Sequence, residues 1–298
     1  MSWLFFALLS PVVYTINNFI DKYVVSREVK DYGGMPIYSA IASFVFGTVF
    51  WIASGFPQLS FKDGLLIIMS GMFTVWAVAF YFKALSDEAT SKIIILFQMG
   101  PVLMLISSYL FLRDFITLSQ FLGFILIMVA VIGVSVERVN MTFKLSSVFF
   151  LILANQVFWT AAGILFKFVV ESNSFVKVVA YESWGIALGG LALFTLFASI
   201  RKSFIGTLFT IKKYAFGIIF FNEGIFLTAR LLSFYAISLG PIALVSVLGS
   251  ASVFFAILLG WILTLFWPKV FNEDVSKQGL FKKVALSILA FLGIILVY

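Results

Sequence analysis

YTINNFIDKYVV, at residues 14–25, returns in altered form as WTAAGILFKFVV at residues 159–170. The two stretches share a threonine, a lysine and a closing pair of valines at matched positions, which indicates an internal duplication. The sequence therefore predicts two related halves, residues 1–140 and residues 141–298.

The composition restricts the chain to the membrane. Hydrophobic residues make up 62% of the sequence and charged residues only 11%, too few to cover a water-soluble protein. The absence of Cys and His removes disulfides, thiolate nucleophiles and His-ligated metal sites. Phosphate-binding and dinucleotide-binding glycine motifs are absent too. We therefore expect no enzyme activity, no metal and no cofactor.

Stretches of about 20 apolar residues, the length needed to cross a bilayer, occur ten times. We predict spans at residues 3–25, 34–55, 64–86, 92–112, 117–137, 145–170, 175–198, 213–238, 241–267 and 281–298, five in each half. A duplicated unit with an odd number of spans inserts its two copies in opposite orientations. The predicted fold is an all-α membrane protein with ten transmembrane helices, arranged as two inverted five-helix repeats around a central cavity.

Basic residues are concentrated in short clusters between the apolar runs. This pattern is typical of cytoplasmic loops, so we expect no nucleic-acid partner despite the net charge of +7. The Lys and Arg bias between the two sides predicts that both termini lie outside. Residues 199–213 and 268–283 are expected to be interfacial loops or short amphipathic helices. Residues 3–25 are expected to be a span rather than a removable signal peptide.

Four passages of the chain resemble the drug/metabolite transporter superfamily, in particular its EamA-like ten-helix branch. In the duplicated helices, aromatic and lysine positions match: Tyr14, Asn17 and Lys22 in the first copy, and Trp159 and Lys167 in the second. The third passage is a proline-centred helix with Gln98, Gly100 and Pro101, and the fourth is the polar pair Tyr181 and Glu182. Val253 departs from the pattern where a proline is usual, and no acidic residue follows Gly260. These departures leave the cargo open.

The resemblance implies a carrier whose cavity is lined by helices 1, 3, 4, 6, 8 and 9, with helices 5 and 10 towards the outside. It also implies termini in the cytoplasm, opposite to the charge bias, and export across a prokaryotic inner membrane. Cargoes in the superfamily range from amino acids and amines to nucleotide sugars.

Three ionisable residues within predicted spans are functional candidates, because a charge at mid-bilayer costs about 2.5–3.5 kcal/mol on insertion scales. They are Glu182, Glu223 and Arg230. Glu223 and Arg230 lie about two helical turns apart on one face, so they could hold the two ends of a zwitterion. We expect a secondary active transporter of small amphoteric metabolites such as amino acids, working by alternating access. The predicted binding residues are Tyr14, Asn17, Trp76, Gln98, Trp159, Glu182, Glu223 and Arg230.

Several alternatives remain open at this stage. Arg230 could pair with Glu182 or Glu223 as a clamp between helices that touches no ligand. Glu223 could exchange a proton during transport, or stay in a permanent ion pair. The cargo could be an organic cation, a quaternary amine or a drug held by the acids and aromatic rings. A membrane receptor or enzyme is a third class, with Ser246, Ser250 and Ser252 as its nucleophile-like cluster. The expected partners are a small-molecule substrate and the bilayer, and a monomer fits the sequence.

Overall fold

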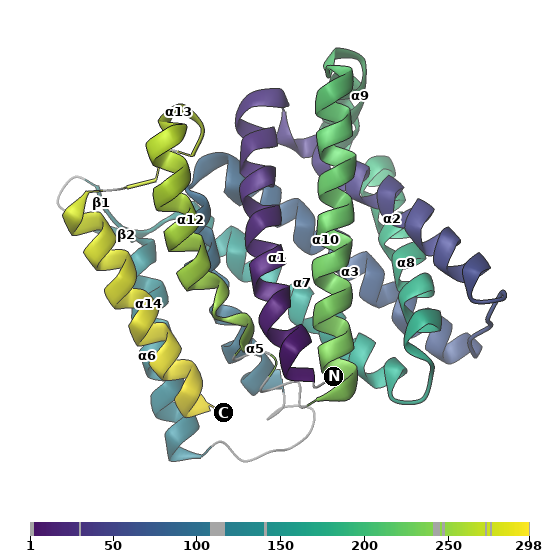
Figure 1. Cartoon of the computed structure of the whole chain (residues 1–298), viewed down its shortest axis with the longest axis horizontal. Helices are drawn as coiled ribbons and strands as arrows, with labels where there is room; N and C mark the ends of the chain where they lie inside the picture. Colours follow the sequence, from purple (N-terminus) through teal and green to yellow (C-terminus); the bar gives the residue numbers. More distant parts are fainter. Residues whose placement is uncertain are drawn as a thin grey trace.

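Long apolar helices, joined by short turns, make up most of the chain (Figure 1). The computed structural model describes residues 3–29, 31–107, 117–139, 142–240, 245, 248–271, 273–274 and 276–297. In the first half the helices are α1 Trp3–Tyr23, α2 Met35–Ala53, α3 Phe61–Asp87, α4 Thr90–Leu96, α5 Met99–Ser107 and α6 Leu118–Ser135, with a π-helical turn η1 Val24–Glu28 and a 3-10 turn η2 Tyr32–Gly34. In the second half they are α7 Ser147–Val170, α8 Phe175–Leu196, α9 Ala198–Thr210, α10 Lys213–Leu239, α12 Ser252–Phe266, α13 Pro268–Phe271 and α14 Lys277–Val297.

Seven helical stretches in the described part of the chain are long and apolar enough to cross a membrane. They are Trp3–Glu28, Tyr32–Ala53, Phe61–Asp87, Ser147–Val170, Phe175–Leu196, Lys213–Leu239 and Lys277–Leu296. Three shorter apolar helices, Thr90–Met104, Leu118–Ala130 and Ser252–Phe266, lie where the other three spans are predicted. The protein is therefore a multi-pass membrane protein, and the full set of ten spans stays a prediction. Residues 108–112 and 241–244 of the predicted spans lie outside the described residues.

The fourth predicted span is broken between α4 and α5. Pro101 has no N–H to offer the carbonyl oxygen of Phe97 four residues earlier. That oxygen instead accepts from the Gly100 N–H at 2.9 Å, which tightens the turn. The break places Phe97 and Gln98 at an irregular position within the bundle.

Three predicted boundaries are wrong. The spans predicted to end at 137 and to begin at 145 instead give way to an antiparallel hairpin, β1 Val136–Val139 and β2 Thr142–Leu145, with Glu137 opposite Lys144. The strands contain Val136, Val139, Thr142 and Phe143, residue types that favour a strand over a helix. The last helix begins at Lys277 rather than 281, because the Ser276 hydroxyl oxygen accepts from the Gly279 N–H at 3.0 Å and caps it. The expected amphipathic segment at 199–213 does form a helix, α9.

Glycines let α3 and α8 pack with their backbones almost in contact. A Cβ added at Gly71 would lie 2.1 Å from the Glu182 carbonyl oxygen, and one at Gly185 would lie 2.3 Å from that of Ile68. The other main helix pairs are α2 with α8, α3 with α7, α6 with α14 and α1 with α10. Small residues at membrane helix contacts are the usual means of such close approach.

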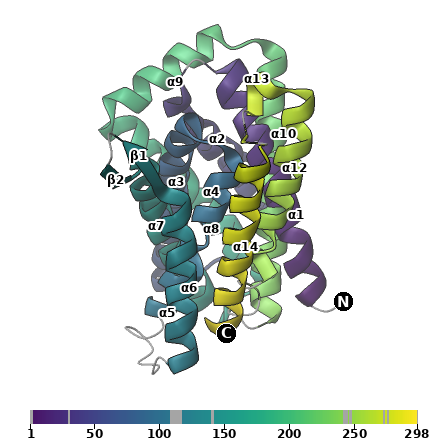
Figure 2. The same cartoon turned by 90° about the vertical axis from the view of Figure 1, so that its left-hand side faces the viewer.

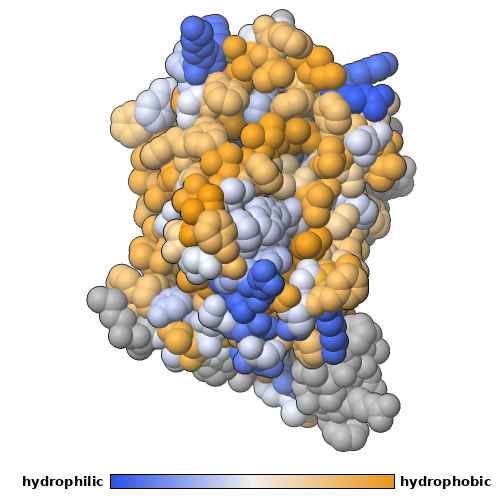
Figure 3. Space-filling model, turned by 90° about the vertical axis from the view of Figure 1, so that its right-hand side faces the viewer, coloured by the Kyte–Doolittle hydropathy of each residue, from blue (hydrophilic) through white to orange (hydrophobic). Residues whose placement is uncertain are grey.

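The two ends of the bundle differ. Both termini lie at the lower end in Figure 1, whereas α9 and α13 lie at the upper end, and Figure 2 shows α9 running across that end. Between the ends the surface is largely apolar, as Figure 3 shows for one side. Exposed side chains of α2 and α8 contribute to it, among them Phe44, Val49, Leu188 and Leu191. This belt is what a bilayer-spanning surface requires.

Candidate functional site

A central cavity of about 280 Å³ lies between the helices of the two halves. Residues of α1, α3, α4, α5, α7, α10 and α12 line it, together with Ser39 of α2. These are the helices at the six positions that the family resemblance implied, since α4 and α5 together occupy the fourth. Its polar walls come from hydroxyls, amides and two carboxyl groups, including Asn17, Asn18, Asp21, Gln98, Asn155, Gln156 and Glu223.

The two carboxyl groups belong to Asp21 of α1 and Glu223 of α10, which are 5% and 8% exposed. Neutral groups donate to both. Asp21 accepts from the Asn222 amide at 2.7 Å and from the Tyr81 hydroxyl at 3.0 Å, and Glu223 accepts from the Ser39 hydroxyl. Among the described residues that line the cavity, none is Lys or Arg. The cavity is therefore an acidic pocket without a lining cation.

The contact between α1 and α10 explains why the two acids meet. Asn17 donates to the Asn222 carbonyl oxygen at 3.3 Å, and Asn222 donates to the Asn17 carbonyl oxygen at 3.4 Å. This reciprocal pair fixes the register of the two helices. Asp21 lies one helical turn beyond Asn17, and Glu223 follows Asn222 directly, so both carboxyl groups lie beside the contact.

Three aromatic rings form one wall of the cavity. Tyr14, Trp159 and Phe226 meet edge to face, with ring centroids 6.4, 6.1 and 6.3 Å apart in the three pairs. The Tyr14 hydroxyl has no hydrogen-bond partner. Trp76, also predicted to bind substrate, lies outside the lining, where its indole N–H donates to the Gly189 carbonyl oxygen at 3.4 Å. The wall offers ring faces and edges suited to a cation or an apolar group.

Glu182 and Arg230 lie behind this wall rather than on it. The Arg230 Nη2 is 3.5 Å from the Glu182 Oε2 and donates to the Ser183 hydroxyl at 3.1 Å. Both side chains are buried, at 1% exposed for Arg230 and 0% for Glu182, and neither lines the cavity. The Phe226 ring lies under the guanidinium, 5.9 Å from its centre. The structure thus does not bring Glu223 and Arg230 together at one cavity surface.

The other predicted residues lie at the cavity with their own helix contacts. Gln98 donates to the Ile94 carbonyl oxygen at 3.1 Å, which leaves its side-chain oxygen available. Ser250 and Ser252 line the cavity, whereas Ser246 lies outside the described residues.

Sequence reasoning missed Asp21, the most important addition to the site. Its signal was present, since Asp21 lies four residues after Asn17 within the duplicated stretch and so on the same helix face. Tyr81, Asn155 and Gln156 are not among the predicted binding residues, and all three line the cavity. Asn155 donates to the Ala77 carbonyl oxygen at 2.9 Å, which joins α7 to α3.

Comparisons with known proteins agree with this architecture. Residues 1–136 match the EamA-like transporter family, part of the drug/metabolite transporter superfamily, which confirms the resemblance seen in the sequence. A solved structure described only as "Crystal structure of protein" covers 96% of this chain, and 95% of its own chain is covered, with a TM-score of 0.52 and 14% sequence identity. At that identity the likeness shows a shared fold alone. No curated protein matches this chain in sequence.

Proposed function

We propose that this protein is a secondary active transporter of small organic cations, in the first place metabolites that carry an amine. The observation that carries the proposal is the pair of carboxyl groups, Asp21 and Glu223, on a cavity wall whose described lining residues include no Lys or Arg. A cationic cargo supplies the charge that such a pocket lacks, and the rings of Tyr14, Trp159 and Phe226 can cover its apolar part. The match of residues 1–136 to a transporter family supports transport over catalysis.

The amphoteric cargo expected from the sequence is the second candidate. It requires a cation for the cargo's carboxylate, and Arg230 is engaged by Glu182 behind the Phe226 ring. One observation still favours it, because Nε and Nη1 of Arg230 have no hydrogen-bond partner although they are buried. Buried donors without partners are rare, so a movement of Phe226 that admitted a carboxylate would satisfy them. The pair with Glu182 makes the amine cargo the better-supported reading.

The packing of the helices supports alternating access by two inverted five-helix halves. In the duplication α1 corresponds to α7, and α3 corresponds to α10. Exchanging the two halves therefore turns the pair α1 with α10 into the pair α7 with α3, which is also observed. The same exchange leaves the pairs α2 with α8 and α6 with α14 unchanged, because the two helices of each pair are counterparts. This pattern is what a two-fold relation between duplicated halves produces, and rearrangement of such halves around a central site is the usual basis of alternating access.

The side on which the basic residues lie indicates how the protein is oriented in the membrane. Arg201 and Lys202 of α9, with Lys212, Lys213 and Lys283, belong to the end opposite the termini. The positive-inside rule favours that end as cytoplasmic, and we propose export from it towards the termini. The prokaryotic inner membrane stays a prediction.

A thermal-shift screen in detergent tests the proposed cargo class. A ligand that binds the native state raises its apparent melting temperature, so putrescine and choline are compared with alanine and glutamate. We expect the cations to stabilise the protein and the effect to be lost in Asp21→Asn and Glu223→Gln. Asp87→Asn, at the exposed end of α3, is the matched control and should keep it. Stabilisation by the amino acids alone, lost in Arg230→Lys, would replace this proposal with the amphoteric cargo.

A further inference from the structure

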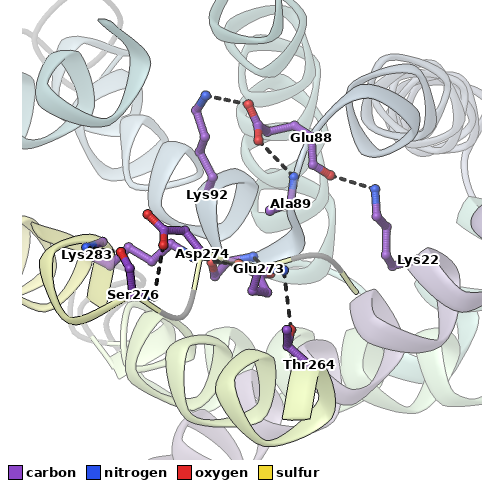
Figure 4. Close-up of polar contacts among 11 residues, drawn as sticks. Lys22, Glu88, Ala89, Lys92, Thr264, Glu273, Asp274, Ser276 and Lys283 are labelled. Atoms are coloured by element: carbon purple, nitrogen blue, oxygen red, sulfur yellow. Dashed lines mark hydrogen bonds and ion pairs between the residues drawn. The ribbon is translucent and has the colours of Figure 1, made fainter. Parts of the chain in front are cut away.

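A buried polar cluster lies beyond one end of the cavity, at the end of the bundle that carries α9 and α13 (Figure 4). Its centre is Glu273, in the linker between α13 and α14, which is 6% exposed. Its carboxylate accepts from the Ser91 backbone N–H at 3.0 Å and from the Ser91 hydroxyl. The Lys283 ammonium lies 2.7 Å from the same carboxylate. Glu273 therefore joins the second half of the chain to the first turn of α4.

The second half holds Glu273 in place. Its backbone N–H donates to the Thr264 hydroxyl of α12 at 3.3 Å, and Lys283 belongs to α14. Gly260 of α12 leaves room for the side chain, because a Cβ there would lie 3.2 Å from the Glu273 Cγ and 3.3 Å from the Phe19 ring. Two helices of the second half thus present the carboxylate towards α4.

The first half positions Ser91 just as firmly. Lys22, the residue after Asp21, is buried and donates to the Leu85 and Glu88 carbonyl oxygens at 2.7 and 2.8 Å. These carbonyls belong to the end of α3, where the helix leaves acceptors unpaired. The Glu88 carboxylate in turn accepts from the Ala89 N–H at 3.0 Å and pairs with Lys92. The turn between α3 and α4 is therefore fixed to α1.

The cluster lies close to residues at one end of the cavity. Asp21, Tyr81, Ile94 and Phe97 line the cavity next to it, and α4 begins at Thr90 with Ser91 in its first turn. Opening this end requires α4 to move away from α12 and α14, which would break the bonds of Glu273 with Ser91. Hydrogen bonds that a carboxylate accepts are stronger than those between neutral groups, so the bonds to Ser91 can hold this end closed.

We propose that Glu273 and Ser91 form a latch between the two halves, which holds this end of the cavity closed and opens once in each transport cycle. The inference rests on the proposed function, since a latch has this purpose in an alternating-access carrier.

Spin-label distances test the latch, and the absence of native Cys gives a clean background. Labels are placed at Lys83→Cys on α3 and Gln278→Cys on α14, two exposed positions on opposite halves that take no part in the cluster. Pulsed electron paramagnetic resonance in lipid nanodiscs then measures the distance between them. We expect a short distance between the labels in the otherwise unchanged protein. In Glu273→Gln we expect a longer distance, populated several-fold more than in the otherwise unchanged protein. Asp274→Asn is the matched control, since that exposed carboxylate accepts from Ser276 within its own loop at 3.0 Å. Glu273→Gln with the same distances as Asp274→Asn would overturn the latch.

Two further measurements separate the latch from folding and from the proposed function. Ser91→Ala removes one donor and leaves Glu273 paired with Lys283, so it should shift the distances in the same direction but less, and no shift would count against the latch. Cation uptake into proteoliposomes is measured in parallel. If the protein takes up the cation but Glu273→Gln does not change the distance between the labels, the latch is overturned and the proposed function is not. A distance change in a protein that takes up no cation overturns the transporter proposal and leaves the contact between the halves supported.

Discussion

The three acids buried among the helices differ in what faces their carboxyl groups. Glu182 faces a guanidinium, whereas Asp21 accepts from the Tyr81 hydroxyl and the Asn222 amide, Glu223 accepts from the Ser39 hydroxyl, and both border the cavity. A charged group taken out of water is stabilised by a partner of opposite charge. Glu182 has this partner within the protein, and the other two acids would find it in a cationic cargo. Selectivity in this account therefore depends on Asp21 and Glu223.

Breaking the Glu182–Arg230 pair should destabilise the protein more than removing the pair altogether. Glu182→Gln leaves a buried guanidinium without its counter-charge, for which we expect a loss of about 3–5 kcal/mol. The double variant Glu182→Gln with Arg230→Gln should recover much of that loss, because no unpaired charge remains. Apparent melting temperatures in one detergent compare the three proteins. A single variant as stable as the unchanged protein would show that the pair with Glu182 adds no net stability.

The sequence identified the important residues of the site better than it predicted which side chains surround them. The cost of burying a charge was enough to single out Glu223 and Arg230. Helical spacing placed the two on one face, but the Phe226 ring and the contact with α8 decide that only Glu223 reaches the cavity. Contacts between helices far apart in the chain cannot be derived from spacing within one helix.

Helices were predicted from apolar runs, and their ends depend on local chemistry. The runs located α3, α8 and α10 to within a few residues, because the length of a span is set by the bilayer. The hairpin at Val136–Val139 and Thr142–Leu145 and the cap at Ser276 were missed, since a few residues of strand or cap do not alter mean hydropathy over a span. The partner of each helix was not predictable, although the glycines that allow α3 to touch α8 are visible in the sequence.

Two glycines of α3 should respond oppositely to the same change. Gly71→Ala places a methyl group against the α8 backbone, for which we expect a loss of about 1–3 kcal/mol from overpacking. Gly64 has nothing within 4 Å of an added Cβ, so Gly64→Ala should gain about 0.5–1 kcal/mol from helix propensity. Melting temperatures of both variants check this prediction. Equal effects in the two would show that α3 and α8 are farther apart than described.

For the whole molecule, the duplicated stretch at residues 14–25 and 159–170 carries the most information. It predicted a membrane carrier built from two halves; the match of residues 1–136 to a transporter family agrees with the carrier, and the two halves stay a prediction. The repeat could not reveal the cargo, because Asp21 corresponds to Phe166 in the second copy and the site is not symmetric. The proposed binding surface is made by residues that differ between the halves.

Uptake of a radiolabelled amine into proteoliposomes tests the central claim most directly. Vesicles that contain the unchanged protein, Asp21→Asn or Asp87→Asn are loaded with unlabelled putrescine, and exchange with labelled putrescine or labelled alanine outside is followed. The account predicts rapid exchange of putrescine by the unchanged protein and Asp87→Asn, at least a tenfold loss in Asp21→Asn, and no exchange of alanine. Exchange of putrescine that is as fast in Asp21→Asn as in the unchanged protein would contradict it.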